Sequence, residues 1–268
     1  MTNRFPDSPP MIVALDKTRL FVAGLAGLIL LNLGNASAHY LLANHPSGFA
    51  NALEALFDFD REGNLSTLYN GLLLLGAALL AGMIALWRRE MRGPGWLAWT
   101  GIALIFAFLF VDELCGLHDS LDFVLQERMV TSGAFAWPWV IAYGALTLVV
   151  AVVYLPFFLR LPRRFQFRFG FAALLYVGGA IGLEMLAAGH ASEHGDEGGL
   201  YTVFVAIEET LEMLAFLLVG HSLIHYLERE CPGFQLSLHP AVGGGSDESP
   251  DSHPNTAAGS VRSTSSAR

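Results

Sequence analysis

Carboxylate and imidazole side chains stand inside or beside apolar stretches of this chain, where an unpaired charge costs about 3 kcal/mol. The residues concerned are Asp112, Glu113, His118, Glu184, Glu208, Glu209 and Glu212. Proteins use these ligand types for zinc, iron or manganese. Glu208 and Glu212 are four residues apart and share a helical face, so they repel one another unless a cation or a shared proton lies between them. We therefore predict that a subset of the seven binds a divalent metal.

The segment around His118 can also be interpreted without a metal. The helical period places four residues on one face of this segment, namely Asp112, Cys115, Asp119 and Asp122. His118 lies at the margin of that face, and Glu113 is expected to point away from it. In the alternative interpretation, Asp112 and Glu113 lie at the membrane interface and only contact water. The Glu-x-x-His pairs of ferritin-like dimetal sites are absent, because Glu113 precedes His118 by five residues.

An oxygen-rich segment lies between the first two apolar stretches. Its polar residues are Asp58, Asp60, Glu62, Asn64, Ser66 and Thr67. Oxygen ligands suit hard cations, but the spacing lacks the glycine and the terminal glutamate of an EF-hand loop. A solvated acidic loop that caps the following helix through Ser66 or Thr67 is the alternative.

Other histidines are weaker candidates for metal ligands. His221 and His225 have ligand-like spacing, yet they lie near the end of a predicted helix, where imidazole is also favoured by the helix dipole. His39, near the end of the first apolar stretch, is closer to the predicted cluster.

Three of these segments together resemble a group of uncharacterised bacterial membrane proteins with six spans. That group has the segments D-x-D-x-E-x-N, D-E-x(4)-H-E and E-E-x-x-E in this order, and here they begin at Asp58, Asp112 and Glu208. The chain departs from the pattern at Asp119, where the group has glutamate. The resemblance implies a multi-pass protein of the bacterial cytoplasmic (inner) membrane, and it names no reaction.

The elements that must position these residues are apolar stretches of membrane-spanning length. They cover residues 20–42, 68–87, 96–116, 137–159, 169–188 and 200–226. A helix that crosses roughly 30 Å of hydrocarbon needs about 20 mostly apolar residues, and none of the stretches shows the alternation of a membrane β-strand. The predicted fold is therefore all-α, a bundle of about six transmembrane helices.

Basic residues predict the orientation of this bundle, because cytoplasmic loops retain them. They gather before the first stretch, between the second and third, and between the fourth and fifth. Both termini are thus predicted to be cytoplasmic, with the cluster near the outer face. The predicted organisation is a cytoplasmic N-terminal segment at 1–19, a transmembrane domain at 20–231 and a disordered cytoplasmic tail at 232–268, because the tail has little to bury. The first stretch could also pass for a cleaved signal peptide, but apolar character resumes after the small residues at its end.

Composition supports a membrane domain and excludes some partners. Hydrophobic residues make up 53% of the chain and charged residues 15%, and a net charge of −9 argues against nucleic acid and an extended basic lipid-binding patch. Cys115 and Cys231 are predicted on opposite sides of the bilayer, which argues against a disulfide between them.

Three function classes fit these observations. The preferred one is a metal-dependent membrane enzyme acting on a lipid or another membrane-soluble small molecule, either by hydrolysis or through a dimetal centre. A cation- or proton-coupled transporter would use the same acidic residues. A structural or assembly protein, in which the polar cluster only locks helices together, needs no chemistry.

Overall fold

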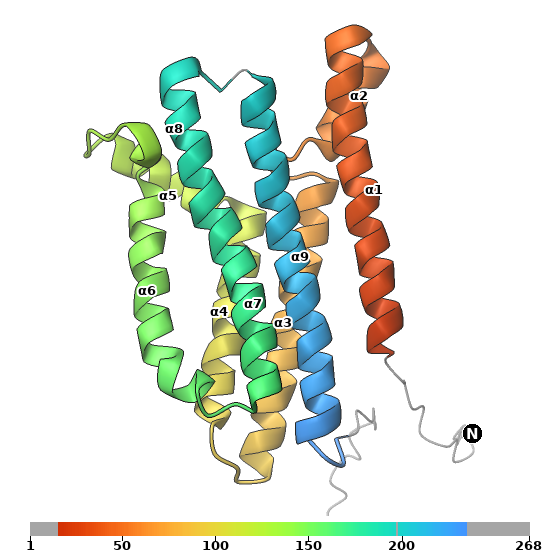
Figure 1. The fold of residues 1–268 in the computed structure, drawn as a ribbon, viewed down its shortest axis with the longest axis vertical. Coiled ribbons are helices and arrows are strands. Elements are labelled where there is room, and N and C mark those ends of the chain that lie inside the picture. Colours follow the sequence, from red (N-terminus) through yellow and green to blue (C-terminus); the bar gives the residue numbers. More distant parts are fainter. Residues whose placement is uncertain (1–15, 197, 235–268) are drawn as a thin grey trace, which may run out of the picture. The chain divides into compact units, whose positions relative to one another are not determined.

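A computed structural model describes residues 16–196 and 198–234, and these residues form helices and no strand (Figure 1). The all-α prediction is therefore confirmed for this part of the chain. Most of the predicted tail and most of the predicted N-terminal segment lie outside the described residues. The helices are α1 Lys17–Asn44, α2 Gly48–Phe57, α3 Leu65–Glu90, α4 Trp96–Cys115, α5 Leu117–Gln126, the short η1 Gly133–Phe135, α6 Trp139–Phe158, α7 Arg163–Val177, the π-helical η2 Gly178–Leu183, α8 Glu184–His194 and α9 Gly199–Glu230.

Five helical stretches are long and apolar enough to span a membrane. They are α1, α3, α4, α6 and the continuous run Arg163–His194 that joins α7, η2 and α8. Large apolar side chains cover their outer surfaces, and Leu30, Leu104 and Leu148 are each 65% exposed. A water-soluble surface rarely carries so much contiguous apolar area, so these helices suit contact with lipid.

Helix α9 runs through the middle of the bundle (Figure 1). It packs against α1, α3, α7, η2 and α8, and its Met213 and Leu223 are completely buried. At Gly179 of η2, a Cβ atom would lie 3.1 Å from the carbonyl oxygen of Glu208, so this position lets η2 approach α9 closely. These neighbours cover much of α9, and its Glu208, Glu209 and Glu212 face the interior of the bundle, where they line a cavity.

The apolar core has two parts. One contains Ile84, Trp99, Phe165 and Leu223 and joins α3, α4, α7 and α9. The other joins α1, α8 and α9 and includes Leu28 and Met213. Close packing of such side chains holds α9 against its neighbours, and it fixes the register in which the polar residues of different helices meet.

Two features of the fold differ from the sequence predictions. A helix in front of the oxygen-rich loop, α2, was missed because its ten residues are too few to span a membrane. The single helical face predicted for Asp112, Cys115, Asp119 and Asp122 is wrong, because Gly116 adopts a left-handed conformation with φ of 55° and separates α4 from α5. Only a glycine takes this conformation readily, so the helix breaks there.

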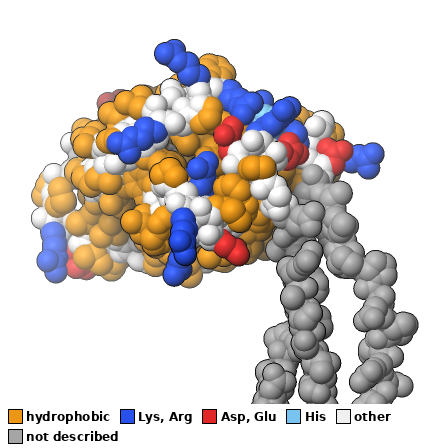
Figure 2. Space-filling view, turned by 90° about the horizontal axis from the view of Figure 1, so that it is seen from below, with side chains coloured by type: hydrophobic (Ala, Val, Ile, Leu, Met, Phe, Trp, Pro, Cys, Tyr) orange, Lys and Arg blue, Asp and Glu red, His pale blue; other side chains and the backbone are white. Residues whose placement is uncertain are grey.

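One end of the bundle is rich in basic residues and is called here the basic end. It contains the start of α1, the α3–α4 and α6–α7 connections and the end of α9 (Figure 1), and Figure 2 shows lysine and arginine side chains around it. Its described basic residues are Lys17, Arg19, Arg88, Arg89, Arg92, Arg160, Arg163, Arg164, Arg168 and Arg229. Lys17 pairs with Glu228, and Arg164 pairs with Glu230 at 2.5 Å, so α1 and α7 are tied to the end of α9. Both cysteines are free, as predicted.

Candidate functional site

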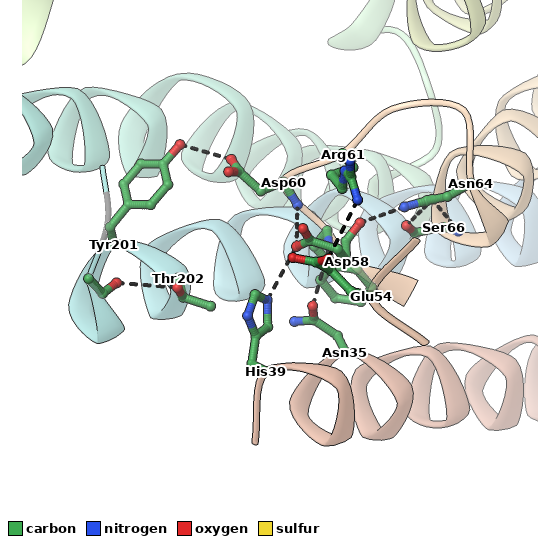
Figure 3. A network of polar contacts seen from close by, with 12 residues as sticks. Asn35, His39, Glu54, Asp58, Asp60, Arg61, Asn64, Ser66, Tyr201 and Thr202 are labelled. Atoms are coloured by element: carbon green, nitrogen blue, oxygen red, sulfur yellow. Dashed lines mark hydrogen bonds and ion pairs between the residues drawn. The ribbon is translucent and has the colours of Figure 1, made fainter. Parts of the chain in front are cut away.

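The loop after α2 is held in place by polar contacts with α1 (Figure 3). Asp58 is 6% exposed, and its Oδ1 lies 3.2 Å from Nε2 of His39 on α1. The backbone N–H of Phe59 donates to Oδ1 of Asn35, also on α1, at 3.3 Å. These contacts place the loop across the end of the bundle opposite the basic end, so His39 acts here as an anchor of the loop.

The far side of this loop is fixed by α3 and α9 (Figure 3). The Asn64 side chain caps α3 by accepting from the backbone N–H groups of Ser66 at 2.9 Å and Thr67 at 3.2 Å. The predicted cap through Ser66 or Thr67 is therefore wrong, because asparagine, a preferred N-cap residue, stands directly before the helix. The hydroxyl of Tyr201 on α9 donates to Asp60 at 2.8 Å. Glu62 lies between these two attachments.

Three potential metal ligands meet where this loop reaches α5. Glu62, His118 and Asp119 each offer a ligand atom, and the three atoms lie within 4.8 Å of one another. The break at Gly116 makes this meeting possible, since a Cβ atom there would lie 2.5 Å from Oε2 of Glu62. One imidazole and two carboxylates suit zinc, iron or manganese, and three protein ligands leave coordination positions open.

Asp112 lies behind His118 and orients it. Its Oδ1 accepts the backbone N–H of His118 and the hydroxyl of Tyr143, each at 2.9 Å, while its Oδ2 lies 3.5 Å from Nδ1 of the His118 ring. The other ring nitrogen, Nε2, faces Asp119 at 3.5 Å. A carboxylate that holds one imidazole nitrogen and leaves the other free is the usual arrangement behind a metal-binding histidine.

The neighbouring carboxylates change the pKa values of Glu62 and His118. Burial raises the pKa of Glu62 above its usual range, and the neighbouring charge of Asp119 raises it further. Burial acts to lower the pKa of His118, but the hydrogen bond and the charge of Asp112 outweigh burial and raise it to about 9. Without another cation, the imidazole therefore holds a proton at neutral pH. A metal ion would replace that proton as the positive charge among these carboxylates.

The three ligands lie on the wall of a cavity of about 410 Å³. All seven residues predicted from the sequence line the same cavity, namely Asp112, Glu113, His118, Glu184, Glu208, Glu209 and Glu212. Asp112 and Glu113 have partners on different helices, because Asp112 accepts from Tyr143 of α6 and Glu113 from Asn70 of α3.

Several residues of the cavity wall have defined hydrogen-bond partners. Glu113 accepts from the Asn70 side chain at 3.0 Å, and Asn70 is completely buried. Glu184 accepts from Nε1 of Trp139 at 3.1 Å. Asp122 accepts the backbone N–H of Trp139 at 3.1 Å and thereby fixes the first turn of α6. Asp122 thus has a structural role, while Trp139 connects α6 to Glu184.

The structure brings the seven predicted residues to one cavity, but the compact group of three possible ligands contains two other residues. His118 is the one predicted residue that belongs to the three-ligand group found in the described part of the chain. Glu62 and Asp119 were missing from the predicted set, although the D-x-D-x-E segment and the residue next to His118 contained the signal. The remaining histidine pair, His221 and His225, lies toward the basic end, where His225 is 3.4 Å from Glu228.

Comparison with known proteins identifies a family and no activity. A family model described as a domain of unknown function (DUF8692) matches residues 20–226, which include the three segments that carry the resemblance. Neither a curated protein nor a solved structure gives a significant match. Because the model matches most of the chain, the protein belongs to the DUF8692 family.

Proposed function

We propose that this protein is an integral protein of the bacterial cytoplasmic membrane with six spans, both termini in the cytoplasm and the cavity open toward the outer side. Five helices of membrane-spanning length and apolar composition support the spans. The concentration of arginine at the basic end supports the orientation, because cytoplasmic loops retain basic residues. Helix α9 would be the sixth span. It carries Glu208, Glu209 and Glu212, which neighbouring helices would shield from lipid.

Within that membrane protein, the cavity is the site of a metal-dependent enzyme that acts on a lipid or another membrane-soluble small molecule. The observation that carries this proposal is the meeting of Glu62, His118 and Asp119 in front of Asp112. A divalent ion with open coordination positions can polarise a substrate oxygen and lower the pKa of a bound water. The protein's own residues hold the ion, orient His118 and supply a cavity deep enough to enclose a reacting group.

Cation- or proton-coupled transport is the second candidate. It is favoured by two further carboxylates on α9, Glu209 and Glu212, which line the same cavity as the three ligands. Buried acidic residues in a row are a common feature of proton and cation pathways. A purely structural role is less favoured, since helices locked together by polar contacts would leave no cavity of about 410 Å³ between them.

Metal analysis tests the proposal directly. Protein purified in mild detergent, then reconstituted with zinc, iron or manganese, is expected to hold about one divalent ion per chain. His118→Ala should lose this ion, because it removes the only imidazole ligand of the group. His45→Ala is the matched control, since His45 is exposed and lies outside the cavity.

The outcomes separate the candidates. Stoichiometric metal in the parent protein and the control, but not in His118→Ala, supports the metal site. A folded protein that binds none of the three metals would contradict the enzyme proposal. Cation or proton flux in proteoliposomes would then become the measurement that decides between transport and structure.

A further inference from the structure

The cavity wall carries more carboxyl groups than the two in the three-ligand metal group of Glu62, His118 and Asp119. Eleven carboxyl groups line it against a single arginine, Arg61, and one histidine. Apart from Asp112, which orients His118, five of them lie outside the metal group on the membrane helices, and they are Glu113, Glu184, Glu208, Glu209 and Glu212. Among the described residues, none of these five joins a three-ligand group as compact as that of Glu62, His118 and Asp119. They are spread along the wall, which suits a cation larger than a bare metal ion.

Glu208 is a buried member of these five carboxyls. It is 9% exposed and lines the cavity, and within the described part of the chain no basic side chain pairs with it. Its near neighbour is the carboxyl of Glu184, which already accepts from Trp139. Two carboxylates cannot bond to one another unless one of them holds a proton. A buried carboxylate of this kind needs a positive charge from a ligand or a proton of its own.

Aromatic rings line the same part of the cavity. Trp139 and Tyr143 meet edge to face with their centroids 5.3 Å apart, and Tyr176 lines the cavity together with Glu212. Trp137 and Tyr201 also line the cavity. The faces of aromatic rings attract ammonium groups, most strongly where water is excluded. Carboxylates together with aromatic rings are a combination that recognises organic cations.

The remaining wall is apolar and adjoins the lipid-facing helix α6. It includes Leu109 of α4, Val177 of α7 and Ile181 of η2, with Thr147 of α6 opposite them. Helix α6 lies at the edge of the bundle (Figure 1) and is largely exposed along its length. A volume of about 410 Å³ lies within the range of small-molecule sites, so a guest could place an apolar portion against this wall.

We propose that the cavity binds an amphipathic organic cation, an amine or quaternary ammonium compound with an apolar chain. Its ammonium group would lie among Glu184, Glu208 and Glu212, near the aromatic rings of Trp139 and Tyr176, and its apolar portion against the wall of α4, α6 and η2. The inference rests on the proposed function only in taking this cavity as the substrate site. A lipid with an anionic headgroup fits poorly, because the cavity wall would repel its charge.

A matched series of ligands tests this on the unmodified protein. Dodecyltrimethylammonium, dodecanol and dodecyl sulfate share one chain and differ in charge. Their binding to metal-free protein in nanodiscs would be followed by tryptophan fluorescence, with empty nanodiscs correcting for partition into lipid. The ammonium compound is expected to bind about tenfold more tightly than the alcohol, and the sulfate more weakly than either. Equal affinity for the ammonium and the alcohol would overturn the proposal, because it would mean that the carboxyls are neutral or remote from the ligand.

Variants then locate the ammonium group. Glu208→Gln and Glu212→Gln should each weaken ammonium binding about tenfold and leave dodecanol binding unchanged. Glu127→Gln removes an exposed carboxylate outside the cavity and should change neither affinity. Unchanged ammonium binding in both cavity variants, with the fold retained, would contradict the assigned position. His118→Ala should keep ammonium binding while losing metal, so failure of the metal site and failure of this inference give different results.

Discussion

At the scale of single residues, two aspartates of the same type have different roles beside His118. Asp112 and Asp119 flank the same imidazole, yet Asp112 is 7% exposed and holds Nδ1, whereas Asp119 is exposed and faces Nε2. A buried carboxylate behind a histidine fixes the ring and strengthens the free nitrogen as a ligand. Asp112 is therefore a positioning residue.

Replacement of Asp112 tests this division. Asp112→Asn keeps an oxygen for the backbone N–H of His118 but removes the charge beside the ring, so metal affinity should fall roughly 10- to 100-fold. Competition with a chelator of known affinity measures this change. Tyr143→Phe removes the other side-chain partner of Asp112 and should have a smaller effect. Metal affinity in Asp112→Asn equal to that of the parent protein would exclude the positioning role.

At the scale of elements, the break between α4 and α5 brings the loop and the helix together. A straight helix would carry His118 past the loop residue Glu62, whereas the turn at Gly116 places them within reach of one ion. The π-helical η2 contributes in a similar way, since its Gly179 lets the wall of the cavity approach α9. Such local departures from α-helical geometry are frequent at functional sites.

The variant Gly116→Ala should affect both stability and metal binding. A side chain at a left-handed position costs about 1 kcal/mol, and here the new Cβ would also lie 2.5 Å from Oε2 of Glu62. We expect a lower melting temperature and weaker metal binding. Gly195→Ala is the matched control, because Gly195 has φ of 84° but nothing within 4 Å of the added Cβ. The control should lose stability alone, and equal loss of metal in both variants would refute the role given to the Glu62 contact.

At the scale of the whole molecule, the asymmetry of charge predicts which end faces the cytoplasm. Single cysteines would be introduced at Arg92 and Arg163 near the basic end and at Glu127 and His194 near the opposite end, with Cys115 and Cys231 replaced by serine. A membrane-impermeant maleimide should label positions 127 and 194 in intact cells and positions 92 and 163 only after permeabilisation. Labelling of Arg163→Cys and Glu127→Cys from the same side would contradict the topology.

The sequence by itself determined the long apolar helices and the types of side chain that line the cavity. The length of an apolar stretch can be read directly from the sequence. The ends of α1, α3, α4 and α6 were therefore predicted within a few residues, whereas the run Arg163–His194 is longer than predicted at both ends. Charge in an apolar stretch is also visible locally, and this identified seven residues that line one cavity, from Asp112 to Glu212.

Only the tertiary structure decided which of these residues can share an ion. Distances between ligand atoms depend on how distant segments pack, and Glu62 reaches His118 because His39 and Tyr201 anchor its loop and Gly116 breaks the helix. The tertiary structure also explains how α9 carries three glutamates through the bundle, since its neighbours separate them from lipid. Sequence periodicity describes one helix at a time, whereas a binding site depends on the packing of several.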